Sequence, residues 1–143
     1  MNRILKISEA ASLALHAMAY LAVNRCKRIP VQEIAVELGA SRDHLSKVLQ
    51  QLHRAGFVES VPGPGGGFSL EKGREGLRLI DIYEAIDGPL RSNGCLLGHP
   101  ICQGKKCVLG GLVESLNKQA RDYLSATRLS DLQNVFRRDG NGS

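Results

Sequence analysis

The sequence between Pro30 and Gly56 most constrains the fold of this chain, because two short helical patterns flank a tight glycine turn. Pro30 is typical of a helix start, and Gly39 interrupts the first pattern. Ser41 is a typical N-cap for a second helix, which we predict over 41–55, and Gly56 is typical of the position after a helix end. The apolar residues of this second helix recur at helical spacing: Leu45, Val48, Leu49 and Leu52. The pattern predicts a helix-turn-helix.

A glycine-rich hairpin is predicted directly after this unit. A strand over 57–61 is followed by the sequence PGPGGG and by a second strand around 68–70. Three further helices are expected, over 8–24 with Ser8 as the N-cap, around 79–86, and over 112–127. The predicted fold class is mainly α with a small β-hairpin, namely a winged helix-turn-helix followed by a long C-terminal helix.

We expect five segments along the chain. A DNA-binding domain, including the N-terminal helix, is predicted over 1–75, and a connecting helix over 76–93. A cysteine-rich loop over 94–108 precedes a dimerisation helix over 109–135, and residues 136–143 are expected to form a disordered tail. The last helix is far in sequence from the rest of the core, which favours packing against a second copy of the chain. The alternative is that this helix covers its own domain.

The polar face of the second helix carries the candidate DNA contacts. Arginine can bond guanine through two donors, glutamine can do the same for adenine, and a helix N-terminus attracts phosphate. The candidates are Ser41, Arg42, His44, Lys47, Gln50, Gln51 and Arg54. Gly65 and Gly66 at the predicted wing tip let the backbone approach DNA closely. The net charge of +5 also suits a polyanionic partner. The alternatives are a solvated helix face and a flexible hairpin tip.

The sequence contains no apolar run long enough to span a bilayer, so no membrane association is expected. Polar residues interrupt the apolar start of the chain, and its helical period argues against a signal peptide. We therefore expect a cytoplasmic protein, in which clustered cysteines more often bind metal or sense redox state than form structural disulfides. We find no C-x-x-C pair, nucleotide loop or nucleophile with a partnered base, so we do not expect an enzyme.

Three of the four cysteines lie in the sequence GCLLGHPICQGKKC, with the spacing C-x6-C-x4-C. The first interval is long for zinc, whereas Cys95, Cys102 and Cys107 suit an iron–sulfur cluster, whose usual protein ligands are thiolates. Two alternatives remain: a zinc site that also uses His99, and a metal-free thiol–disulfide switch. Cys26 stands alone, and we interpret it as structural or incidental.

Taken together, these motifs resemble the Rrf-two (Rrf2) family of bacterial winged-helix regulators. The resemblance rests on ASRDHLSKVLQQLHRAGFVESVPGPGGGFSL, on LRLIDIYEAIDG, on the cysteine triad and on the long last helix, and it covers nearly the whole chain. It implies a homodimer that binds palindromic promoter DNA. It also implies a 2Fe–2S or 4Fe–4S cluster on Cys95, Cys102 and Cys107, with 4Fe–4S favoured. We therefore expect a repressor that senses redox state, nitric oxide or iron–sulfur status.

Three positions depart from the family's patterns. Gly110 stands where some members have a histidine ligand, so that ligand is not supported here. Other members take an aspartate from the partner's N-terminal helix, and Ser12 matches that position. Glu9 lies one helical turn earlier and is the first candidate for the fourth ligand, with Ser12 and His99 as further candidates. Pro62 replaces an arginine that often precedes the wing glycines.

Overall fold

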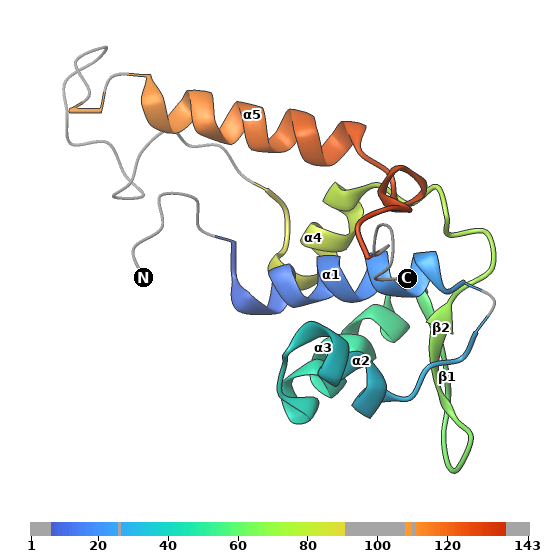
Figure 1. Cartoon of the computed structure of the whole chain (residues 1–143). Helices are drawn as coiled ribbons and strands as arrows, with labels where there is room; N and C mark the ends of the chain where they lie inside the picture. The colour runs from blue at the N-terminus through green and yellow to red at the C-terminus, as the bar shows by residue number, and fades with distance from the viewer. Residues whose placement is uncertain (1–6, 26, 91–107, 110, 137–143) are drawn as a thin grey trace, which may run out of the picture.

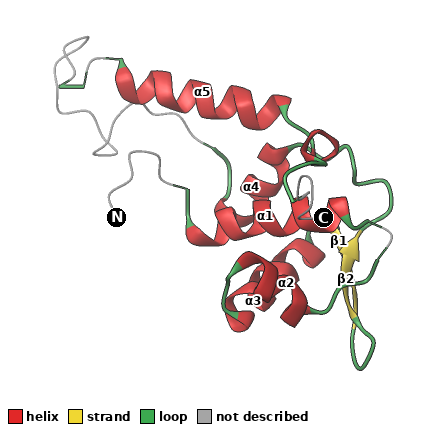
Figure 2. Cartoon of the chain, viewed as in Figure 1, coloured by secondary structure: helices red, strands yellow, loops and turns green. Residues whose placement is uncertain are grey.

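The computed structural model describes residues 7–25, 27–90, 108–109 and 111–136 of the chain, and these residues form a mainly helical fold with one small hairpin (Figures 1 and 2). In chain order the elements are α1 (Glu9–Val23), α2 (Val31–Leu38), α3 (Arg42–Arg54), β1 (Val58–Val61), β2 (Gly67–Leu70), α4 (Leu79–Asp87), α5 (Leu112–Ala126) and a 3-10 helix, η1 (Leu129–Leu132). The predicted fold class is confirmed. None of the helices in the described ranges has the length and apolarity needed to cross a bilayer.

Helix α1 is the central element of the fold. It lies between α2 and α3 on one side and α4 and α5 on the other (Figure 1). Its buried face is made largely of small side chains, and Ala11, Ala14 and Ala17 have no exposed surface. These small residues allow the neighbouring helices to approach α1 closely. A displacement of α1 would therefore change the packing of α3, which is in contact with it.

Helices α2 and α3 form the predicted helix-turn-helix. Gly39 ends α2 in the left-handed conformation, with φ of 63°, and its N–H donates to the Val36 carbonyl oxygen over 3.3 Å. The Ser41 hydroxyl oxygen accepts a hydrogen bond from the His44 N–H over 3.2 Å and so caps α3. The apolar face of α3 is buried at Leu45, Val48, Leu49 and Leu52.

Strands β1 and β2 pair antiparallel, from Val58 opposite Leu70 to Val61 opposite Gly67, and residues 62–66 connect them. Ile29 adds an isolated bridge on the outer edge of β2. Its N–H donates to the Phe68 carbonyl and its carbonyl accepts from the Phe68 N–H, both over 2.8 Å. The wing is therefore fixed to the segment that leads into α2, and is more than a free hairpin.

Helix α5 packs on α4, but much of its apolar surface stays exposed. Leu124 is buried, whereas Leu112 is 50 % and Tyr123 59 % exposed. The helix ends at Ala126, because Thr127 turns into extended backbone, and η1 follows as a separate element. The segment 109–135 is thus not one continuous helix. The Leu79 N–H donates to the Thr127 carbonyl over 2.9 Å, which ties the end of α5 to the start of α4.

Candidate nucleic-acid interface

The face of α3 opposite the core is exposed and strongly polar. It carries Asp43, Lys47, Gln50 and Arg54, at the spacing i, i+4, i+7 and i+11 of one helix face. Lys47, Gln50 and Arg54 were predicted as DNA contacts from the sequence. Asp43 was missed, although its helical phase in the sequence places it in the same row. Because the second helix of a helix-turn-helix lies in the major groove, this row is the candidate DNA-contacting surface.

The other predicted residues of α3 lie beside this row. At 100° per residue, Arg42 lies on one flank, where it is exposed, and His44 and Gln51 lie on the other, where they are half-buried. Ser41 uses its oxygen to cap the helix, so its hydroxyl proton remains free to donate to a phosphate. The structure thus places three of the predicted residues in a central row and Arg42, His44 and Gln51 on its flanks.

The wing tip carries the two predicted glycines in different settings. Gly65 is exposed, and its φ of 75° is in the left-handed region. Gly66 is buried, and its N–H donates to the Gly63 carbonyl over 2.9 Å. A Cβ on Gly66 would collide with the Val61 carbonyl oxygen. Gly66 therefore shapes the turn, and Gly65 is the glycine that presents backbone to a partner.

A cavity of about 310 Å³ separates the start of α1 from the helix-turn-helix. It is lined by Glu9, Ser12, Leu13, His16, Leu38, Ala40 and His44. His16 Nδ1 lies 2.6 Å from the Ser12 carbonyl oxygen and must carry the proton, because a carbonyl can only accept. The cavity brings two candidate cluster ligands, Glu9 and Ser12, into the same space as His44 of α3.

The predicted ligands Cys95, Cys102, Cys107 and His99 lie outside the described residues, as do Cys26 and Gly110. Within the described ranges no three His, Cys, Asp or Glu side chains are grouped to hold a metal ion. Glu9 is exposed on the first turn of α1 and makes no hydrogen bond or ion pair with other described residues. Of the candidate ligands, only Glu9 and Ser12, both on α1, lie within the described residues.

The point where the chain enters the cysteine segment is firmly held. The Leu90 N–H donates to the Glu84 carboxylate over 2.9 Å, and its carbonyl accepts from the Arg121 guanidinium of α5 over 3.1 Å. The Ser8 hydroxyl donates to Asp87 Oδ1 over 2.7 Å and links the start of α1 to the last residue of α4. The beginning of α1 and the origin of the cysteine segment are thus parts of one hydrogen-bonded unit.

Two half-buried tyrosines, Tyr20 and Tyr83, have pKa values above the ordinary value for tyrosine. Burial raises the pKa of Tyr20, and the carboxylates Glu33 and Glu37 of α2 add to this shift. Burial likewise raises the pKa of Tyr83, with further contributions from Asp87 and Glu84. Both hydroxyls therefore stay neutral at physiological pH.

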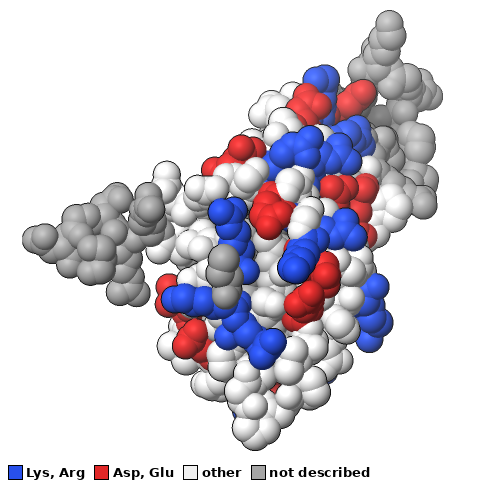
Figure 3. Space-filling model, turned by 90° about the vertical axis from the view of Figure 1, so that its right-hand side faces the viewer, with Lys and Arg blue, Asp and Glu red and all other residues white. Residues whose placement is uncertain are grey.

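Charge on the side of the molecule shown in Figure 3 is mixed. Lysine and arginine side chains alternate there with acidic ones and form no continuous basic patch on this face. The wing lies on this side of the molecule in Figure 1, so charge alone does not single out an interface there. The candidate interface rests on the exposed row on α3 and on the wing that follows this helix in the chain.

An exposed polar row on the second helix of a helix-turn-helix, followed by a wing, is typical of a winged-helix transcriptional regulator. Comparison with protein families agrees: residues 7–135 match the Rrf2 model, described as an iron-dependent transcriptional regulator. The chain belongs to the Rrf2 family, and it is a transcriptional regulator rather than an enzyme.

Individual relatives span nearly the same length. A protein of Aquifex aeolicus (strain VF5), whose name describes an HTH-type transcriptional regulator, is 36 % identical over 131 residues, covering 90 % of this chain and 91 % of its own. The HTH-type transcriptional regulator IscR of Escherichia coli O1:K1 / APEC is 28 % identical, covering 91 % and 81 %. Among solved structures, CymR (YrzC), the global cysteine regulator of B. subtilis, superposes with a TM-score of 0.74 at 24 % identity, covering 92 % of this chain and 98 % of that one.

Proposed function

We propose that the protein acts as a cytoplasmic homodimer that binds palindromic promoter DNA through two α3 helices and two wings. The observation that carries this proposal is the exposed row on α3, in which Lys47, Gln50 and Arg54 share one face. A twofold pair of such helices matches half-sites about one helical turn, roughly 10 base pairs, apart or a multiple of that distance.

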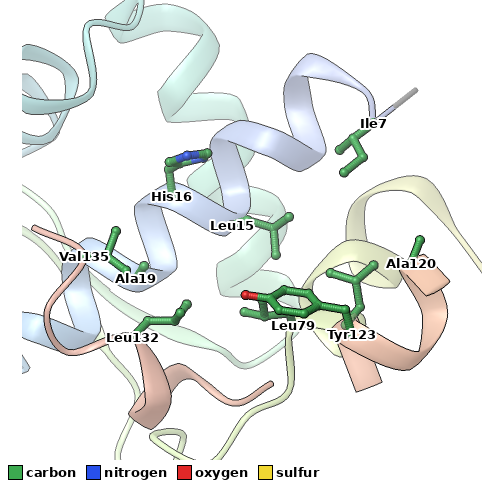
Figure 4. Close-up of a pocket in the computed structure, with 10 residues that line it drawn as sticks. Ile7, Leu15, His16, Ala19, Leu79, Ala120, Tyr123, Leu132 and Val135 are labelled. Atoms are coloured by element: carbon green, nitrogen blue, oxygen red, sulfur yellow. The ribbon is translucent and has the colours of Figure 1, made fainter. Parts of the chain in front are cut away.

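The proposed dimer surface is the apolar side formed by α1, α5 and η1. A cavity of about 330 Å³ opens there (Figure 4), and its lining residues are Ile7, Leu15, His16, Ala19, Leu79, Ala120, Tyr123, Leu124, Leu132 and Val135. The exposed side chains of Leu112 and Tyr123 on α5 extend the apolar surface. An exposed apolar surface of this kind marks an interaction site. In a twofold dimer the same surface of a second copy covers it, so that α5 of one protomer packs against apolar side chains of its partner.

We also propose that the regulator carries an iron–sulfur cluster on Cys95, Cys102 and Cys107, with 4Fe–4S favoured over 2Fe–2S. Thiolates are the usual protein ligands of such clusters, three of them leave one ligand to be supplied, and the family's description as iron-dependent agrees with an iron site. Glu9 is the first candidate for the fourth ligand, because its carboxylate is exposed and uncommitted; Ser12 and His99 are the others. When bound, the cluster would be a redox-active group, and its oxidation or loss would change how the three cysteines are bound.

The signal is proposed to reach DNA through α1. In our proposal the cysteine segment of one protomer contacts α1 of its partner near Glu9. Since α1 packs on α3 and shares a cavity with His44, a shift of α1 alters how α3 is held. Regulation follows only if the two states differ in DNA affinity. We propose that the state with the higher DNA affinity represses transcription.

Anaerobic purification tests the sensor directly. We expect a coloured protein containing iron and acid-labile sulfide, and Cys102→Ser should lose both. Cys26→Ser is the matched control, because it removes a thiol outside the triad and should leave the spectrum unchanged. Zinc without sulfide would instead establish a zinc site. A colourless, metal-free protein whose DNA affinity responds to oxidant would establish a thiol–disulfide switch.

Footprinting on the promoter of its own operon tests the DNA-binding half of the proposal independently of the cluster. We expect protection of a twofold-symmetric sequence, with an affinity that differs between the cluster-loaded and cluster-free protein. Equal affinity in both states would contradict the proposed switch while leaving DNA binding intact.

A further inference from the structure

We propose that Asp43 is a specificity-determining residue of α3, which selects cytosine in the major groove and opposes binding to other sequences. The inference rests on the proposed DNA interface and deepens it. Arginine, lysine and glutamine were predicted as DNA contacts because they can donate hydrogen bonds, which a carboxylate cannot do.

The position of Asp43 supports this role. It lies in the first turn of α3, and the N-terminal part of a recognition helix is the part that contacts base edges. It is exposed, and it begins the row that continues through Lys47, Gln50 and Arg54. If these three side chains face the groove, Asp43 faces it too.

The helix itself makes little use of this carboxylate. In α4 and η1 the first-turn carboxylates help to hold the helix start, since Asp81 accepts from the Arg78 N–H over 3.2 Å, and Asp131 from the Arg128 N–H over 2.9 Å. Asp43 has no such bond, because it is the second residue of its helix and the equivalent third position of α3 is His44. Its remaining structural contribution is a favourable interaction with the helix dipole.

Asp43 also lacks an ion-pair partner among the described residues. Lys47 follows one turn later on the same face, the spacing at which Lys118 and Asp122 on α5 form an ion pair of 2.7 Å. Asp43 and Lys47 form none, so both charges point to solvent where DNA would lie. An uncompensated carboxylate facing a polyanion weakens binding unless a donor on the DNA meets it.

The chemistry of base edges identifies that donor. A carboxylate is only an acceptor, and the cytosine N4 amino group is the donor that Asp or Glu contacts in the major groove. Guanine presents two acceptors there and thymine presents one, so both would oppose Asp43 with lone pairs, whereas adenine presents its N6 donor beside the N7 acceptor and is the weaker match. Asp43 thus combines a favourable contact to cytosine with repulsion of guanine and thymine, which raises specificity at the expense of affinity.

The test is selection from randomised duplexes by the full-length dimer, purified without oxygen, comparing wild type with Asp43→Ala and Asp43→Asn. We expect wild type to select cytosine at one position of each half-site, with a preference over guanine of about tenfold or more. Asp43→Ala should lose this preference and bind random duplex more tightly. Asp43→Asn should move the preference towards adenine, whose N6 and N7 match an amide.

Lys47→Ala is the matched control from the same face. It should weaken binding to every duplex and retain the cytosine preference, because it removes a cation and leaves Asp43 in place. Altered helix stability alone would not convert a cytosine preference into an adenine preference. If both Asp43 variants select the same bases as wild type, the assignment is overturned. If wild type binds no duplex, the proposed DNA interface fails, and the assignment fails with it.

Discussion

The DNA interface predicts a definite salt dependence and a definite change when one of its cations is removed. Arg42, Lys47 and Arg54 are exposed on α3, which places six such side chains in a dimer. If each neutralises one phosphate, the slope of log K against log salt concentration is about −5, so affinity falls about 10³-fold between 50 and 200 mM salt. Lys47→Ala removes two contacts per dimer and should make the slope shallower by about 2.

Fluorescence anisotropy with an operator duplex, titrated at five or six salt concentrations, measures both slopes. Lys118→Ala is the control, since Lys118 is exposed on α5 and paired with Asp122, away from α3. It lowers the net charge by the same amount and should leave the slope unchanged. A wild-type affinity that hardly varies with salt would refute the assignment of these residues to the groove, as would equal effects of Lys47→Ala and Lys118→Ala.

Three further predictions concern the wing, the core and high pH. Gly66→Ala should distort the wing turn and lower DNA affinity in an anisotropy titration, because its Cβ would meet the Val61 carbonyl; Gly65→Ala, with open space around it, should do so far less. Leu49→Ala should lower the free energy of urea unfolding by about 2–5 kcal/mol, whereas Val36→Ala at a 71 % exposed site should change it by less than about 0.5 kcal/mol. The pKa of Tyr20 and of Tyr83 is raised in the folded state, so the free energy of unfolding should fall as the pH rises above about 10. Urea unfolding measured between about pH 9 and 11 should show a smaller fall for Tyr20→Phe than for wild type.

The helix-turn-helix was predictable because its determinants are local. Capping by Ser41, the left-handed Gly39 and the apolar spacing of α3 act within a few residues of one another, and each has the predicted role in the structure. The hairpin was predictable for the same reason. Its attachment to the body was not, because the bridge between Ile29 and Phe68 joins segments that are distant in sequence.

The candidate interface was predicted only in part, for two physical reasons. The half-burial of His44 depends on the packing of α1 against the helix-turn-helix, which no local pattern reveals. Asp43 was overlooked because residues were chosen by their ability to donate to DNA rather than by helical phase. The three cysteines and His99 lie outside the described residues, so their assignment as ligands stays a prediction.

The dimer surface gives a last prediction, in which charge is placed on α5 without disturbing the fold. Tyr123 is 59 % exposed and lies along the apolar cavity in Figure 4, while its neighbour Leu124 is buried within the protomer. Tyr123→Glu should therefore leave the circular dichroism spectrum and unfolding midpoint nearly unchanged, yet shift sedimentation from dimer to monomer. Leu124→Glu is unsuitable for this purpose, because it would bury a charge in the protomer core.

Loss of the dimer should also appear in DNA binding. A monomer brings one α3 to one half-site, so the slope of log K against log salt should fall to about half of its wild-type value. Lys118→Glu is the control and should stay dimeric, although it changes the charge of α5 by two units rather than one and also removes the ion pair with Asp122. If Tyr123→Glu remained dimeric and kept the full slope, α5 and its apolar cavity would face solvent or another partner, and the two recognition helices would have to be held together by a different surface.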